Sequence, residues 1–197
     1  GGPFEFGFLI FQRDADGAWE QLDFVVPAEY DKNNGVSFDF SGEHLIVCSP
    51  FSKQNSNVFV YTLNASGTYE ETFQISDPST GYSAFGRSIA VHGSLIGIGD
   101  EYWPNEQDRG TVWLYRRNAD GSWSSDSQVS GQNSGERIGN EFALYEDVLC
   151  VITSRDSSSS IDIGRVYRRT GAGSWSYVGV FTETQLDLRT LEECERR

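Results

Sequence analysis

The sequence of 197 residues contains no methionine, three cysteines and two histidines. It also lacks an apolar run of the roughly 18 residues that a membrane-spanning helix needs. The missing run excludes an inserted membrane span, and no signal peptide is visible. Because the sequence opens on Gly1-Gly2-Pro3 and has no methionine, we expect a processed product or a fragment of a longer chain.

The few cysteines do not have the spacing of metal ligands. No two of them form a CxxC pair, which excludes a metal ribbon. Cys48 and Cys150 each lie in an apolar segment, where a small buried thiol is expected. Cys194 lies in a charged tail, where it could pair with another chain.

Positive charge is scarce, since 15 basic residues stand against 29 acidic ones and the net charge is −14. A surface of this sign repels phosphate backbones and anionic membranes, so neither nucleic acid nor a membrane is an expected partner. The chain instead has 14% aromatic residues and 21 glycines. That composition suits many short strands joined by tight turns.

One hairpin pattern occurs four times. Its turn glycines are separated by 50, 54 and 52 residues: Gly17, Gly67, Gly121 and Gly173. An aromatic residue follows two positions after each glycine, and another precedes it by six: Trp19, Tyr69, Trp123 and Trp175, then Phe11, Tyr61, Tyr115 and Tyr167. Asn, Asp and Gly at the centre provide the positive φ that such turns need.

A second pattern keeps the same period. Segments beginning at Gly35, Gly86 and Gly139 read GVSFDFSGEHLIVCSP, GRSIAVHGSLIGIGDE and GNEFALYEDVLCVITS. Each predicts a strand, a short turn and a more apolar second strand. Four strands in a unit of about 52 residues predict an all-β fold of β-propeller blades.

Three segments carry a family resemblance: Phe85-Gly86-Arg87-Ser88, Leu95-Ile96-Gly97-Ile98-Gly99 and Thr111-Val112-Trp113-Leu114-Tyr115. Together they resemble the FG-GAP repeat, the blade of the integrin α-subunit propeller. The resemblance covers about residues 5–182. It is weakest in the third full blade, where Ile138-Gly139 replaces Phe-Gly.

The resemblance implies which strands belong to which blade. A half blade spans 5–26, and full blades span 35–76, 86–130 and 139–182. A charged tail at 183–197 favours a short helix. The resemblance also implies cell adhesion and an extracellular, cell-surface or organelle-lumen location.

Three and a half blades make an incomplete ring. The strand that carries Phe6, Phe8 and Ile10 then presents an apolar edge, and such edges pair with other chains. A second copy, another polypeptide or the rest of a longer chain could supply what is missing, or residues 1–12 could pair elsewhere. We favour a missing upstream or partner segment.

Metal and catalytic sites are not indicated. FG-GAP repeats often bind calcium between the first two strands, but here those turns are too short for calcium's oxygen ligands: Ser41-Gly42-Glu43, His92-Gly93-Ser94 and Tyr145-Glu146-Asp147. We therefore expect no calcium and no other cofactor. His44 and His92 are expected at solvent-facing turns without a catalytic partner, so we expect no enzyme.

The best binding candidate is the loop from Asp100 to Arg109. A Tyr-Trp pair beside acidic residues and an arginine has the composition of a binding hot spot. The candidate residues are Glu101, Tyr102, Trp103 and Arg109, with Tyr82 and Tyr30 on neighbouring loops. The competing interpretation is a loop packed on itself, in which Trp103 covers the neighbouring blade.

Asn64-Ala65-Ser66 is a possible N-glycosylation sequence on a hairpin turn. The leading functional hypothesis is a non-enzymatic protein-interaction or structural subunit of a larger assembly. Two alternatives remain open: a carbohydrate-binding propeller, and an accessory domain of a secreted hydrolase.

Overall fold

The computed structural model describes residues 7–27, 36–48, 56–79, 83–103, 107–153 and 163–182. These residues form fourteen strands and no helix, and every sheet is antiparallel. None of them forms a helix with the length and hydropathy of a transmembrane span. The expectations for Phe6, Tyr30, Tyr82 and the 183–197 tail with Cys194 lie outside the described residues.

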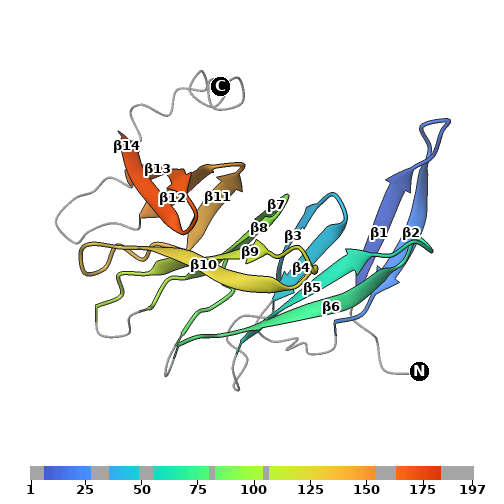
Figure 1. Cartoon of the computed structure of the whole chain (residues 1–197), viewed down its shortest axis with the longest axis horizontal. Coiled ribbons are helices and arrows are strands. Elements are labelled where there is room, and N and C mark those ends of the chain that lie inside the picture. The colour runs from blue at the N-terminus through green and yellow to red at the C-terminus, as the bar shows by residue number, and fades with distance from the viewer. Residues whose placement is uncertain are drawn as a thin grey trace.

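The strands form four sheets, which we number I to IV along the chain (Figure 1). Sheet I contains β1 (Phe8–Arg13) and β2 (Trp19–Val25). Sheet II contains β3 (Ser37–Ser41), β4 (His44–Cys48), β5 (Asn57–Leu63) and β6 (Tyr69–Ser76). Sheet III contains β7 (Ile89–His92), β8 (Leu95–Asp100), β9 (Thr111–Arg117) and β10 (Trp123–Ser130). Sheet IV contains β11 (Glu141–Tyr145), β12 (Val148–Thr153), β13 (Ile163–Gly171) and β14 (Ser174–Thr182).

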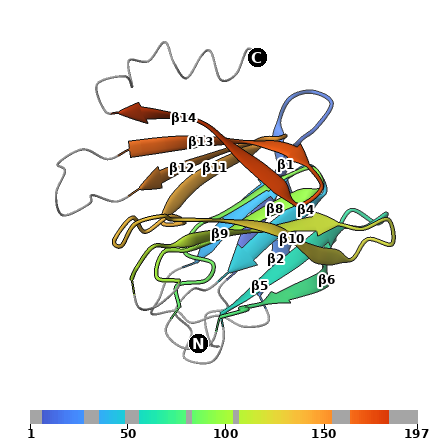
Figure 2. The same ribbon diagram turned by 60° about the vertical axis from the view of Figure 1, so that its left-hand side comes forward.

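Each four-stranded sheet is a meander in chain order, so the all-β prediction is confirmed and the sheets fit incomplete propeller-like blades. The four sheets lie one after another in chain order, and we call this arrangement the fan (Figures 1 and 2). The first strands of the three full sheets lie next to each other, since β7 contacts both β3 and β11. This is where a propeller places its innermost strands.

The last two strands of every sheet share a β-bulge. The register shifts at Ile10/Phe11, Val60/Tyr61, Ser125/Ser127 and Val166/Tyr167. In each outer strand the extra residue follows the turn glycine by five positions, and these residues are Leu22, Thr72, Asp126 and Val178. A bulge increases the local twist, so the outer hairpins of all four sheets bend at the same place.

Apolar cores fill the spaces between neighbouring sheets. One cluster joins sheets I and II around Leu45 and Phe59, and a second joins sheets II and III around Ile46 and Ile96. The third joins sheets III and IV around Leu114 and Leu149. The second strands, β4 and β8, are buried along their whole length, which explains their continuous apolar sequences.

Close approach between sheets depends on glycine. Gly86 has a φ of 84°, and a Cβ there would lie 2.0 Å from the Cys48 sulfur of sheet II. A Cβ on Gly99 would lie 2.0 Å from the Gly139 carbonyl oxygen of sheet IV. The glycines therefore set the distance between successive sheets.

Candidate interaction surfaces

The predicted binding loop is anchored by its own neighbours. Asp100, at the end of β8, is fully buried, and its carboxylate accepts hydrogen bonds from the Ala84 and Tyr102 amides and the Ser83 hydroxyl. Burial raises the pKa of Asp100, although these hydrogen bonds oppose the rise. This network fixes the backbone at the start of the loop.

Tyr102 and Trp103 are half-buried rather than fully exposed. The Arg137 guanidinium carbon lies 5.3 Å from the centre of the Tyr102 ring, which is a cation–π contact. The Trp103 and Trp113 rings are 6.4 Å apart, so Trp103 covers a strand of its own sheet. The structure thus places both aromatic rings in contacts that a self-packed loop would make, and sugar binding by these rings stays a prediction.

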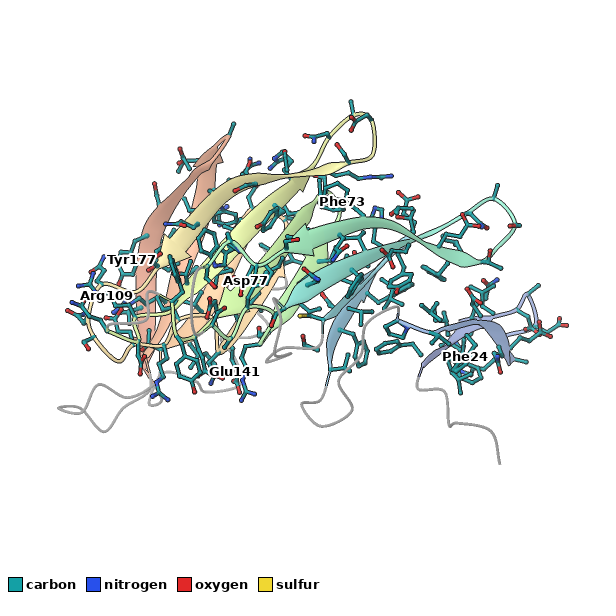
Figure 3. All side chains as sticks on the ribbon, turned by 90° about the horizontal axis from the view of Figure 1, so that it is seen from below. Phe24, Phe73, Asp77, Arg109, Glu141 and Tyr177 are labelled. Carbon is teal, nitrogen blue, oxygen red and sulfur yellow. The ribbon has the colours of Figure 1, made fainter. Side chains whose placement is uncertain are left out.

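Neither charged candidate of this loop is fully exposed: Glu101 is buried beside an arginine, and Arg109 is half-buried. Glu101 is buried and lies 3.4 Å from the Arg87 Nε atom. Arg109 is half-buried, and its backbone carbonyl accepts a hydrogen bond from the Ile138 amide. Figure 3 shows Arg109 at the end of the molecule that carries sheet IV. The four candidates therefore do not form one exposed patch.

An ion pair between buried Glu136 and half-buried Arg165, which the sequence patterns did not reveal, fixes the loop between sheets III and IV. The two terminal guanidinium nitrogens of Arg165 donate to the Glu136 carboxylate, at 3.0 and 2.6 Å, and the Asn133 side-chain amide and the Gln132 backbone amide donate to it as well. Burial alone would raise the pKa of Glu136, but these hydrogen bonds outweigh it and lower that pKa. The pair ties residues 131–137 to β13.

Asp108 and Arg137 connect this loop to the predicted binding loop. The two residues have φ values of 46° and 50°, which non-glycine residues rarely adopt. The Arg137 amide donates to the Asp108 carbonyl at 3.1 Å, and its guanidinium donates to the Asp108 carboxylate at 3.2 Å. These paired contacts hold both residues in their unusual conformation.

The histidine prediction was wrong for His44. This residue is buried, because its ring packs edge to face against Trp123 of sheet III and its Nδ1 atom contacts the Thr62 hydroxyl. His92 is half-buried; its Nδ1 atom accepts a hydrogen bond from the Glu146 amide of sheet IV. Both histidines therefore join neighbouring sheets.

The turns considered for calcium each contain two residues between their strands, as in Ser41 paired with His44 and His92 paired with Leu95. Among the described residues there is no group of three or more His, Cys, Asp or Glu side chains that could hold a metal ion. Cys48 is buried as predicted, whereas Cys150 is only half-buried, because it lies on the outer face of β12, opposite the buried Leu149 and Val151.

The Asn64 side chain acts within its own turn. Its Nδ2 atom donates to Thr68 and Glu70, and its Oδ1 atom accepts from the Ser66 and Thr68 amides. Asp14 accepts equivalent amide hydrogen bonds in the turn of sheet I. Turn capping therefore accounts for this side chain, and glycosylation of Asn64 stays a prediction.

The largest exposed apolar side chains gather at the two ends of the fan. At the first end they lie on sheet I, just after it, and on β3: Leu9, Phe11, Trp19, Phe24, Val26, Phe38 and Phe40. At the other end they lie on sheet IV: Tyr145, Ile152, Tyr177, Val178 and Val180. Within the described residues, sheet III and strands β4–β6 carry none of these side chains. Figure 3 shows Phe24 at one end and Tyr177 at the other.

The sequence predicted an exposed apolar edge at the strand that carries Phe8 and Ile10, and the structure shows where these two side chains lie. Phe8 and Ile10 turn toward sheet II and pack against its core, whereas Leu9 and Phe11 point to the opposite, open side. Sheet I is held to sheet II by a hydrogen bond of 2.6 Å from the Tyr69 amide to the Asp23 carboxylate. Within the described residues, β1 has only β2 as a neighbour in its sheet.

Comparison with protein-family models finds no match for this chain, and comparison with curated protein sequences finds none either. The resemblance to the FG-GAP repeat therefore stays a prediction from the motif residues.

Proposed function

We propose that this chain is a non-enzymatic protein-interaction or structural subunit that joins a larger assembly through the open ends of its fan of sheets. The observation that carries the proposal is the division of exposed apolar side chains: both end sheets and strand β3 present them, whereas the described residues of sheet III and of strands β4–β6 do not. On sheet I the exposed Leu9 and Phe24 are paired across the two strands, and contiguous exposed apolar surface marks interaction sites.

The interior of the fan supports the same proposal. Where one sheet packs on the next, apolar residues are buried and polar contacts cross the gap, as in the Arg169 to Asp126 ion pair of 3.1 Å between sheets IV and III. Stacked units normally cover one another in this way, and end units need a polar outer face or a partner. Exposed apolar side chains remain on both end sheets, among them Leu9 and Phe24 on sheet I and Ile152 and Val178 on sheet IV, so we propose that a partner covers them.

Size-exclusion chromatography with light scattering tests this function on the full chain over a wide range of protein concentrations. We expect the mass of the isolated chain to rise with concentration. Two paired substitutions should reduce that rise: Leu9→Ser with Phe11→Ser, and Ile152→Ser with Val178→Ser. A matched control pair, Ser124→Ala with Ser174→Ala, removes exposed polar groups and should leave the mass unchanged. A stable monomer at every concentration would contradict the proposal.

A further inference from the structure

The three innermost strands place matching apolar side chains at matching positions. Phe40, Val91 and Leu144 each precede the residue pair that closes the first turn of their sheet, and Phe38, Ile89 and Phe142 lie two positions earlier. These six residues point toward the preceding sheet. Their environments can therefore be compared directly.

The comparison shows that β3 lacks the cover that β7 and β11 have. Ile89 and Val91 are 9% and 5% exposed, whereas Phe38 and Phe40 are 59% and 49% exposed. Leu144 of β11 is buried, and Phe142 packs against the core between sheets III and IV. A surface that fits these two phenylalanine rings would remove their exposed apolar area from water, which favours binding.

The fold also shows what kind of element provides that cover. Ile89 and Val91 are covered by the first two strands of sheet II, with Ile46 and Cys48 of β4 in the same core. The Asp39 carboxylate of β3 accepts a hydrogen bond of 2.6 Å from the Val91 amide, and the Ser37 hydroxyl donates to the Gly86 carbonyl. The covering element is therefore a two-stranded hairpin whose first strand makes polar contacts with the covered strand and whose second strand supplies the apolar side chains.

Sheet I is the sheet that precedes β3, and its two strands occupy the third and fourth positions of a blade. Both carry the bulge and turn of the corresponding pairs β5–β6 and β9–β10. In sheets II and III the third strand pairs with the second strand, as β5 pairs with β4. The side of β1 opposite β2 is thus where the second strand of a hairpin would pair.

The other end of the fan is built differently. Position 152 corresponds to Cys48 and Gly99, each the fourth residue after the residue that closes the first turn, and these small residues face Gly86 and Gly139 of the next sheet. Sheet IV has Ile152 there, and its β-branched side chain would collide with a glycine that approached as closely. Sheet IV therefore cannot pack against a following sheet through a close glycine contact, whereas β3 at the first end can be covered by a preceding hairpin.

We propose that the surface formed by Phe38, Phe40 and the open side of β1 binds a β-hairpin with the pattern of this chain's own inner strands, donated by another polypeptide. Its first strand covers Phe38 and Phe40, and its second strand extends sheet I to a four-stranded sheet. This inference rests on the proposed function and names the partner of one of its two ends.

The probe is a synthetic peptide with the sequence of residues 35–49, the hairpin that covers Ile89 and Val91 in sheet II. Phe38 and Phe40 of the peptide are replaced by Thr to prevent its polymerisation, and Cys48 by Ser. We expect saturable binding of the labelled peptide to the full chain by fluorescence anisotropy. A control peptide that also carries Ile46→Ser should bind at least tenfold more weakly, because Ile46 is in the covering core.

The matched protein variants locate the site. Phe38→Ser with Phe40→Ser should weaken peptide binding at least tenfold, whereas Ile152→Ser with Val178→Ser at the other end should leave it unchanged. Both pairs replace exposed side chains, and circular dichroism with urea unfolding confirms that the variants remain folded. Equal binding by both variants, or no binding by the wild-type chain, would overturn the inference.

Two outcomes identify a different occupant and would also overturn it. A discrete dimer that dissociates in the Phe38→Ser and Phe40→Ser variant would assign the surface to a second copy. The chain could also fail to bind the peptide while its β3 amides are already protected from hydrogen exchange. That result would assign the surface to another segment of the same chain. In either case a concentration-dependent mass would still support the proposed function.

Discussion

The rings of Phe8 and Phe38 meet edge to face, with centroids 5.2 Å apart and planes inclined by 62°. This contact joins sheet I to the innermost strand of sheet II, yet it covers only one side of Phe38, which remains mostly exposed. The contact fixes the orientation of sheet I relative to β3, and these two elements together form the surface that we propose binds a hairpin.

The spacing between sheets II and III depends on Gly86. Gly86→Ala should destabilise the fold for two reasons. The left-handed conformation costs a residue with a Cβ about 1–2 kcal/mol, and the collision of that Cβ with Cys48 costs about 1–3 kcal/mol more. The control is Gly93→Ala, which has a φ of 56° and no atom within 4 Å of the added Cβ. Urea unfolding should show the larger loss for Gly86→Ala, and equal losses would contradict this packing.

The Glu136–Arg165 pair should make a large contribution to stability. Glu136→Gln leaves the half-buried Arg165 without its carboxylate partner, and breaking a fully buried pair costs about 3–5 kcal/mol, which is the upper bound here. Glu43→Gln disrupts an exposed pair with Arg117 and should cost less than about 1 kcal/mol. Free energies of unfolding from urea titrations at neutral pH provide the comparison.

The same pair gives a pH dependence. Because the pKa of Glu136 is lowered in the folded state, its stabilisation is present above the unfolded value of about 4.3 and is lost as the pH falls through the folded value. The difference between wild type and Glu136→Gln should therefore shrink in acid. A difference that stayed constant from neutral pH into that range would show that the charge is not involved.

His44 titrates in a different range. Burial, and then the charge of Arg117, lower its pKa, while Glu43 opposes them. A lowered pKa means that the neutral ring stabilises the fold above the unfolded value of about 6.5, and that this stabilisation is lost as the pH falls through the folded value. The stability advantage of wild type over His44→Gln should decrease below pH 6.5, which chemical unfolding at several pH values would measure.

Cys48 and Cys150 should differ in reactivity. Burial raises the pKa of the Cys48 thiol far above its usual range, so almost no thiolate forms there. Cys150 is half-buried on the outer side of sheet IV. With Cys194 replaced by Ser, a thiol reagent should label Cys150 in the folded chain and Cys48 only after unfolding. Labelling of both at the same rate in native buffer would contradict the packing of sheets II and III.

The strands and turns were predictable because their signals are local. Turn glycines, paired aromatics and apolar second strands all lie within a few positions of each other, and the structure confirms the all-β sheets that they indicate. The burial of side chains between neighbouring sheets was not predictable in this way, because the residues that cover them are distant in the sequence. His44 looked like a turn residue, but Trp123, 79 positions further along the chain (123 − 44), covers it.

The binding loop shows the same limit. Its composition suggested exposed aromatic residues, but Arg137 and Trp113 come from other segments to cover Tyr102 and Trp103. Glu136 and Arg165 carry no local motif, and only the packing of sheet IV on the preceding loop brings them together. The count of strands predicts an unpaired edge at the strand that carries Phe8 and Ile10, and within the described residues β1 pairs only with β2.

Hydrogen–deuterium exchange of the isolated chain tests the open end most directly. Strands β3 and β7 have the same place in their sheets, but only β7 is covered by a preceding pair of strands, so β3 should open at a lower free energy. We predict that the amides of residues 37–41 exchange faster than those of 89–92, and that the hairpin peptide slows only the former. Equal protection of both strands in the isolated chain would contradict an open end at β3.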